Sequence, residues 1–171
     1  SYKCAKASAY VNKKNLPSES WLVSPWIELS CAEVIRNLYF DHAVSKYFGN
    51  VSEEATLWIK AEGGDWTQYT SITYPEVPQG KSFSAFETQT VSLAGYEGKK
   101  IKVGFKYVST DKAAGTWEIR NFIVCSGDPS GISEINADKF DVNAPVYNLA
   151  GQRVNANAKG ILIQNGKKFI K

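Results

Sequence analysis

The chain has 171 residues, of which 43% are hydrophobic and 22% charged, and a formal net charge of +3. This composition excludes an intrinsically disordered chain, and the length suits one β-sandwich with an appendage. Residues 137–171 hold six basic and two acidic residues, a net +4, which leaves −1 for the rest of the chain. A nearly neutral main body has no electrostatic footprint for nucleic acid, so we expect no such partner.

Strand patterns separated by turn residues fill the chain, and helical periodicity is almost absent. Along residues 100–108 apolar residues alternate with lysines, which predicts a half-buried antiparallel strand with Gly104 on its polar side. A Gly-rich run at residues 62–65 predicts a hairpin. We expect strands at residues 3–11, 21–28, 34–42, 56–61, 67–73, 83–91, 100–109 and 116–124. Aromatic residues make up 13% of the chain, which also favours an all-β sandwich, most simply a jelly roll.

The composition changes after residue 125. The turn-rich run SGDPSG at residues 126–131 predicts the start of a linker. We therefore divide the chain into a jelly-roll domain at residues 1–127, a linker at 128–136 and a small C-terminal β module at 137–171. Asn165-Gly166 is the strongest hairpin signal in that module, because Asn-Gly tolerates the positive φ angles of a type I′ turn.

The cysteines, and the lack of a transmembrane segment or signal peptide in the sequence, indicate little about function. Cys4, Cys31 and Cys125 lie in strand-like stretches without a CxxC or Cys/His cluster, so we expect buried free thiols, with a Cys4–Cys31 bridge left open. No apolar run approaches the roughly 18 residues of a membrane helix, so we expect no transmembrane segment. The chain holds no Met and no signal peptide. We expect a processed or excised piece, in which a missing signal is no argument against export.

Side chains that could carry catalysis are sparse. His42, the only histidine, shares a strand face with Leu38 and Phe40, so we expect a buried, hydrogen-bonded structural residue. Glu53 and Glu54 are adjacent and are expected to be solvated loop charges rather than the carboxylate pair of a glycosidase. No GxSxG, HExxH, phosphate-binding or dinucleotide-binding motif occurs. We therefore predict a protein that is not an enzyme.

Two kinds of binding site are considered. Exposed aromatic rings near strand ends can stack on sugars, and the candidates are Trp26, Trp66, Tyr69 and Tyr74. The alternative is that Trp21, Trp58 and Trp117 form the core and the other rings only rim the sandwich. A structural calcium ion is the second kind, because carboxylates and carbonyls of loops can ligate it. The ligands considered for it are Asp41, Glu118 and Asn121, although no EF-hand spacing groups them.

Several ordered motifs resemble one known family. They are KASAYV at residues 6–11, ESWLVSPWIELS at 19–30, LYFDH at 38–42, the hairpin between Trp58 and Trp66, and TWEIRNFIV at 116–124. Together they resemble the cleaved-adhesin, or choice-of-anchor J, jelly-roll domains, which are similar to the adhesin modules of gingipain-type proteases and to MAM-like sandwiches. The resemblance covers residues 5–126 and implies a galactose-binding-domain-like jelly roll, in some members with structural calcium.

Two further points follow from the resemblance. Such domains occur on exported proteins of bacteroides-type bacteria. Their last strand often carries two acids where this chain has Arg120 and Asn121, which weakens the transfer of a calcium site. In the tail, VYNLAGQRV at residues 146–154, KGILI at 159–163 and GKK at 166–168 resemble C-terminal units related to type IX secretion sorting domains. That likeness implies a sorting or anchoring role.

The residues and the resemblance together predict a non-catalytic, adhesin-like binding module at the extracellular or outer-membrane surface. We expect a monomer that recognises a glycan or a host or extracellular protein through loops at one end of the sandwich. Two alternatives are left open: a carbohydrate-binding accessory domain of a glycan-degrading enzyme, and a structural spacer.

Overall fold

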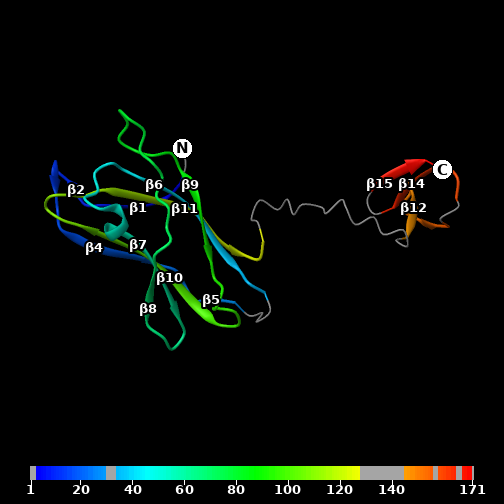
Figure 1. Cartoon of the computed structure of the whole chain (residues 1–171), viewed down its shortest axis with the longest axis horizontal. Helices are drawn as coiled ribbons and strands as arrows, with labels where there is room; N and C mark the ends of the chain where they lie inside the picture. Colours follow the sequence, from blue (N-terminus) through cyan, green and yellow to red (C-terminus); the bar gives the residue numbers. More distant parts are fainter. Residues whose placement is uncertain (1–2, 30–33, 128–144, 156–157, 165–166, 171) are drawn as a thin grey trace. The chain divides into compact units, whose positions relative to one another are not determined.

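A computed structural model of the chain describes residues 3–29, 34–127, 145–155, 158–164 and 167–170 (Figure 1). The chain forms two compact units, residues 1–131 and 132–171. The predicted linker at residues 128–136 lies outside the described residues. The first unit contains β1 (Ala5–Ser8), β2 (Tyr10–Val11), β3 (Lys14–Asn15), β4 (Ser18–Val23), β5 (Ile27–Glu28), β6 (Asn37–Val44), α1 (Val51–Glu54), β7 (Ala55–Ala61), β8 (Trp66–Tyr69), β9 (Glu87–Ser92), β10 (Lys100–Ser109) and β11 (Thr116–Cys125).

Two antiparallel sheets face each other in the first unit (Figure 1). One has the order β1-β11-β6-β9 and the other β4-β10-β7-β8, with β5 also paired to β10. Apart from the short β2, β3 and β5, the strands pair from the outside inwards: β1 with β11, β4 with β10, β6 with β9, and β7 with β8. This nested pairing over two sheets is that of a jelly roll, and it confirms the predicted fold class.

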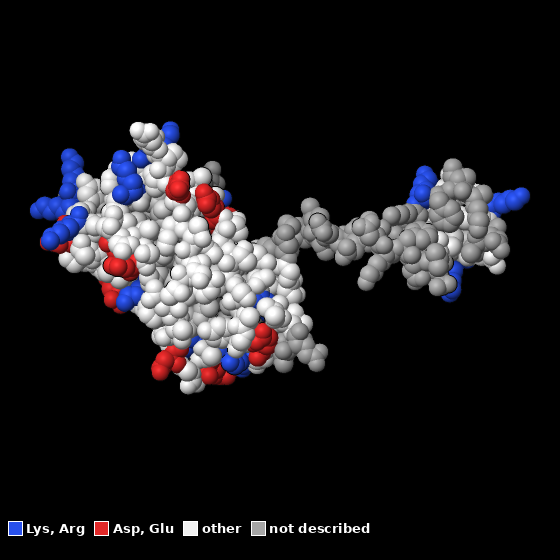
Figure 2. Space-filling view, viewed as in Figure 1, with Lys and Arg blue, Asp and Glu red and all other residues white. Residues whose placement is uncertain are grey.

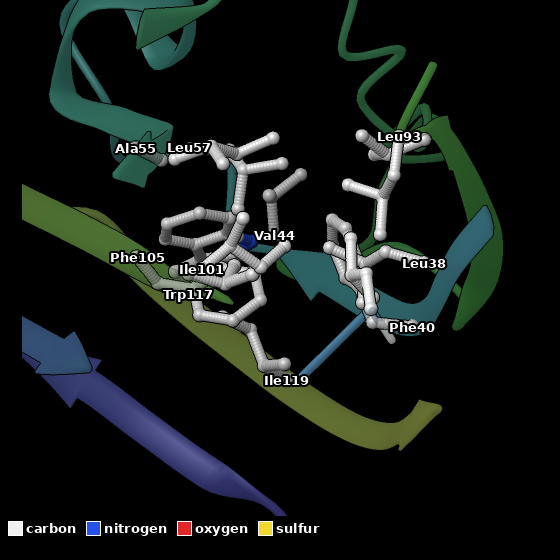
Figure 3. Close-up of a cluster of buried hydrophobic side chains, with 14 residues drawn as sticks. Leu38, Phe40, Val44, Ala55, Leu57, Leu93, Ile101, Phe105, Trp117 and Ile119 are labelled. Atoms are coloured by element: carbon white, nitrogen blue, oxygen red, sulfur yellow. The ribbon is translucent and has the colours of Figure 1, made fainter. Parts of the chain in front are cut away.

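The core lies between the two sheets (Figure 3). Because side chains alternate across a strand, every second residue of β6, β7, β10 and β11 points inwards. Each such Leu, Ile or Phe contributes roughly 1.5–3 kcal/mol when it is fully buried. The core residues of the long strands include Leu38, Phe40, Val44, Leu57, Ile59, Ile101, Val103, Phe105, Trp117 and Ile119.

Several predicted strand boundaries are wrong for local reasons. The strand predicted at residues 3–11 is divided at Ala9, because β1 pairs with β11 whereas β2 pairs with β3. Asn12 and Lys13, both with positive φ, make the turn between β2 and β3. The strand predicted at residues 67–73 ends early, at Tyr69, and the strand predicted at 83–91 begins late, at Glu87. The segment between them packs on the core through Ile72, Tyr74 and Val77 instead of extending either strand. The strand predicted at residues 100–109 coincides with β10, whose alternation is the most regular in the chain.

The expected loop charges Glu53 and Glu54 lie in the short helix α1. Asn50 caps this helix by accepting a hydrogen bond from the Ser52 amide, at 3.2 Å. Glu54 accepts hydrogen bonds from the amides of Gly49 and Asn50, at 3.2 and 3.0 Å. The Glu54 carboxylate therefore fixes the entry of the helix and is not merely solvated.

The second unit contains β12 (Val146–Asn148), β13 (Arg153–Val154), β14 (Ile161–Gln164) and β15 (Lys167–Ile170), in the sheet order β13-β12-β14-β15. The hairpin of β14 and β15 is confirmed, since Gln164 lies opposite Lys167. The connecting Asn165-Gly166 lies outside the described residues. Asn148 shapes the turn between β12 and β13, because its Oδ1 accepts hydrogen bonds from the amides of Ala150 and Gln152, both at 3.0 Å.

Cys4 and Cys125 are free but only half-buried, so the prediction of buried thiols is wrong for both. Cys4 lies just before β1, and Cys125 is the last residue of β11. Cys31 lies outside the described residues. The described part of the chain holds no helix with the length and apolarity that a membrane crossing requires.

Candidate functional site: a tryptophan–lysine face

His42 is confirmed as a structural residue. Its side chain is 1% exposed, and its Nδ1 accepts a hydrogen bond from Trp117 Nε1 at 3.3 Å. Its Nε2 therefore carries the proton and donates to the Thr73 carbonyl at 3.1 Å. Burial lowers the pKa of His42 from 6.5 to about 4. A neutral imidazole with both nitrogens engaged stabilises the core and has no surface for substrate.

The three residues considered for calcium do not assemble as ligands. Asp41 accepts hydrogen bonds from Thr88 Oγ1 at 2.7 Å, from Asn121 Nδ2 at 2.7 Å and from Arg120 Nε at 3.3 Å. Burial alone would raise the pKa of Asp41, but these donors and the Arg120 charge lower it overall. Both carboxylate oxygens of Asp41 are thus engaged by protein donors, one of which is the positively charged Arg120.

Asn121 and Glu118 have other local roles. Asn121 has a φ of 52° and forms a β-bulge in β11, where the register with β6 shifts between Arg120 and Ile123. Its amide nitrogen faces Asp41, whereas a metal ligand would present the oxygen. Glu118 lies two residues before Arg120, opposite Ala43 and Lys6. Within the described residues no three His, Cys, Asp or Glu side chains group to hold a metal, and the calcium prediction stays a prediction.

The four aromatic residues predicted as a ligand site divide into two pairs. Tyr69 and Tyr74 are half-buried and pack against the core. The Tyr74 hydroxyl donates a hydrogen bond to the Ala55 carbonyl, and burial raises the pKa of Tyr74 to about 12. Trp26 and Trp66 instead lie at the outer surface, beside β10 and on β8. Trp26 is exposed and Trp66 is half-buried, but both lie on the outer side of the sheet, so the predicted set is divided between its two sides.

Trp21 and Trp58 join Trp26 and Trp66 at the solvent side, so the prediction that they lie in the core is wrong. Trp117 is the core tryptophan, 2% exposed, whereas Trp21 is 38% and Trp26 43% exposed. We call this surface the tryptophan–lysine face; it is formed by the outward residues of the five-stranded sheet and comprises Trp21, Trp26, Trp58, Trp66, Lys60, Lys102, Gly104 and Lys106.

Three indole rings converge over the middle of β10. The ring centroids of Trp21 and Trp66 are 5.5 Å apart, and those of Trp21 and Trp58 are 5.8 Å apart, at interplanar angles of 42° and 53°. Gly104 makes this approach possible, because a Cβ there would lie 3.1 Å from atoms of both Trp21 and Trp66. A glycine inside a regular strand was the signal in the sequence that could have located the cluster.

Hydrogen bonds and charges hold the rings in place. Trp21 Nε1 donates to Glu19 Oε1 at 3.1 Å, and the Glu19 carboxylate forms an ion pair with Lys106 at 3.2 Å. The Trp21 hydrogen bond and then Lys106 lower the pKa of Glu19. Trp58 Nε1 donates to Thr56 Oγ1 at 2.9 Å. The ring faces are thus oriented before any ligand arrives, which reduces the entropy lost on binding.

The strand register places the remaining lysines between two tryptophans. Lys102 of β10 lies directly opposite Lys60 of β7, and Lys60 lies opposite Trp66 of β8. On the other side, Lys102 Nζ is 4.9 Å from the centroid of the Trp26 ring. The face therefore contains a row in the order Trp26, Lys102, Lys60, Trp66, in which aromatic surfaces flank two ammonium groups.

A separate hollow lies at the end of the sandwich formed by the β2–β3 hairpin, the loop after β6 and the β10–β11 turn. It is a cleft of about 850 Å³ whose lining includes Tyr10, Tyr47, Phe83, Asn15, Lys6 and Lys112. Asn15 Nδ2 donates to the Lys112 carbonyl at 3.0 Å and joins the hairpin to the turn. Figure 2 shows that the middle of the sandwich is largely uncharged on the face drawn and that basic and acidic side chains lie around its rim.

No protein-family model matches the chain, and no curated protein matches it. Among solved structures, the chain is similar to the K3 cleaved adhesin domain of Lys-gingipain from Porphyromonas gingivalis W83, with 18% sequence identity and a TM-score of 0.43. That likeness covers 72% of this chain and 74% of the other. At this TM-score it adds nothing to the strand order, on which the jelly-roll assignment rests.

Proposed function

We propose that this chain is a non-catalytic, adhesin-like binding module of an exported surface protein and that it recognises carbohydrate through the tryptophan–lysine face. One observation carries the proposal: four of the five tryptophans lie on the outer side of one sheet, and only Trp117 lies in the core. Large apolar rings usually face the core, so four of them on the outer side of one sheet, two exposed and two half-buried, mark an interaction site.

Carbohydrate fits this surface better than a flat apolar partner. An indole face packs against the C–H groups of a sugar ring, while neighbouring polar groups bind its hydroxyls. On this face Gln68 lies opposite Trp58, and Lys60 lies opposite Trp66. The adhesin-like character, the export and the bacteroides-type origin rest on the sequence motifs of residues 5–126 and of the tail alone.

The test is glycan binding by the full chain and by Trp66→Ala and Trp26→Ala. We expect each substitution to weaken binding by about five- to tenfold, because stacking contributes on the order of 1–1.5 kcal/mol per ring. Tyr96→Ala is the matched control, since this half-buried ring packs against the core away from the face. If wild-type protein binds no glycan, or if the tryptophan variants bind as well as the control, the carbohydrate proposal is wrong.

A protein partner at the loop-end cleft is the second candidate. The observation that favours it is the exposed aromatic rim of the 850 Å³ cleft, where Tyr10 is 57% and Tyr47 53% exposed. Tyrosines of this kind are enriched in protein interfaces. Extracellular protein binding that is lost in Tyr47→Ala but retained in Trp66→Ala would support this candidate instead. A structural spacer predicts that neither variant changes any interaction.

A further inference from the structure

Lys60 and Lys102 form an unfavourable pair in the isolated protein. They lie directly opposite each other on adjacent antiparallel strands, on the same face of the sheet. Side chains in that position have Cβ atoms about 5 Å apart, and like charges there destabilise a sheet. Lys106 differs, because its charge is paired with Glu19. Within the described residues neither Lys60 nor Lys102 makes an ion pair, so the pair lacks a compensating anion.

The positive charge at this pair is confined to a small area. One row further along β10, Lys100 lies opposite Glu28, and the amide of Glu62 donates to the Lys100 carbonyl at 2.9 Å. On the other side the Lys106 charge is balanced by Glu19. A polyanion such as nucleic acid would meet these carboxylates on both sides of the lysine pair. A ligand with a single localised negative charge could contact the lysine pair without meeting these carboxylates.

We infer that the tryptophan–lysine face binds an acidic glycan, with the carboxylate of a uronic-acid-type sugar between Lys60 and Lys102 and sugar rings stacked on Trp66 and Trp26. The inference rests on the proposed carbohydrate function and names its ligand class. The carboxylate supplies the missing anion and accepts charge-assisted hydrogen bonds from both ammonium groups. The two flanking indoles provide the apolar surfaces for the C–H faces of that sugar and its neighbour.

The experiment measures binding of the full chain to an oligouronate and to the same oligosaccharide after its carboxylates have been reduced to alcohols. The variants are Lys60→Gln/Lys102→Gln and Trp66→Ala. Lys46→Gln is the matched control, because Lys46 also lies over an aromatic ring, with Nζ 5.5 Å from the Tyr47 centroid, outside the face. Thermal melts of all the variants check folding. The double lysine variant should retain the wild-type transition, because it removes the repulsion between two half-buried like charges.

We expect wild-type protein to bind the oligouronate about tenfold more tightly than its reduced counterpart. The lysine double variant should lose that preference and bind both ligands equally, whereas Trp66→Ala should lose affinity for both. Equal binding of both ligands by wild type, or an unchanged preference in the double variant, overturns the acidic ligand but leaves carbohydrate binding intact. Absence of binding to either ligand overturns the carbohydrate function itself. Tighter binding to single-stranded nucleic acid than to the oligouronate also overturns the inference.

Discussion

His42 makes the stability of the sandwich depend on pH. Because its folded pKa of about 4 lies below the ordinary 6.5, the folded state is favoured above pH 6.5 and loses stability as the pH falls towards 4. Each pH unit between 6.5 and 5 costs about 1.4 kcal/mol, so we expect a loss of about 2 kcal/mol at pH 5. Urea unfolding across this range measures it.

The control is His42→Gln, which should be less stable at neutral pH but nearly independent of pH between 6.5 and 5. Asp41 does not contribute to the pH dependence between 6.5 and 5. Its pKa is lowered from 3.8, so its contribution to folding stability is lost only below that range. A wild-type stability that stays constant down to pH 5 would contradict the buried, neutral imidazole.

Gly104 controls the packing of the indole rings. Gly104→Val should keep the fold, since a β-branched residue suits a strand, but overpacking against the rings should lower the free energy of unfolding by about 1–3 kcal/mol. Its Cβ would displace Trp21 and Trp66, so the near-ultraviolet circular dichroism of the coupled indoles should fall. Gly64→Val is the control, because a Cβ there meets only the Ala61 carbonyl, at 3.6 Å. Unchanged indole spectra in Gly104→Val would show that the rings do not depend on this glycine.

At the scale of elements, the turn between β12 and β13 accounts for Asn148 in the tail sequence VYNLAGQRV at residues 146–154. Asn148→Ala removes two side-chain hydrogen bonds to backbone amides and should destabilise this sheet by about 1–2 kcal/mol. Faster hydrogen exchange at Val146 and Val154, which face each other across the pair, would report it. Leu149→Ala is the control, since Leu149 is exposed and its side chain lies outside these bonds. Equal exchange in both variants would show that the Asn148 side chain does not hold the turn.

The elements also show what local patterns can predict. The alternation in β10 predicted its bounds and its buried side, because a strand with one apolar face buries that face against the core. It could not predict that the other face is aromatic, since Trp21 and Trp58 reach it from β4 and β7 through pairings distant in sequence. Hydrophobicity alone assigned both rings to the core. Only the register shows that they share a side with the lysines.

For the whole molecule, composition and strand spacing were sufficient for the fold class but not for the site. The jelly roll follows from many short strands that must cover one core. The site depends on which row of β10 meets which row of β7, and a shift of one residue would move Lys60 and Trp58 to the inner side. Two of four predicted binding residues reached the face, because an aromatic residue near a strand end serves the core as readily as the surface.

The jelly roll should also fold without the tail. Its nested strand pairs lie within residues 5–125, and so do all the residues of its core cluster. We therefore expect deletion of residues 137–171 to leave the melting temperature and the glycan affinity of the sandwich unchanged, although the net charge falls from +3 to −1. Calorimetry of both chains tests this expectation.

Deletion from residue 116 onwards is the positive control for that experiment. It removes β11, which pairs with both β1 and β6 and carries Trp117 into the core. This chain should show no cooperative transition, since loss of a central strand exposes the inner faces of both sheets. If the chain that ends at residue 136 also loses its transition, the sandwich draws stability from the tail, and the two compact units do not fold independently.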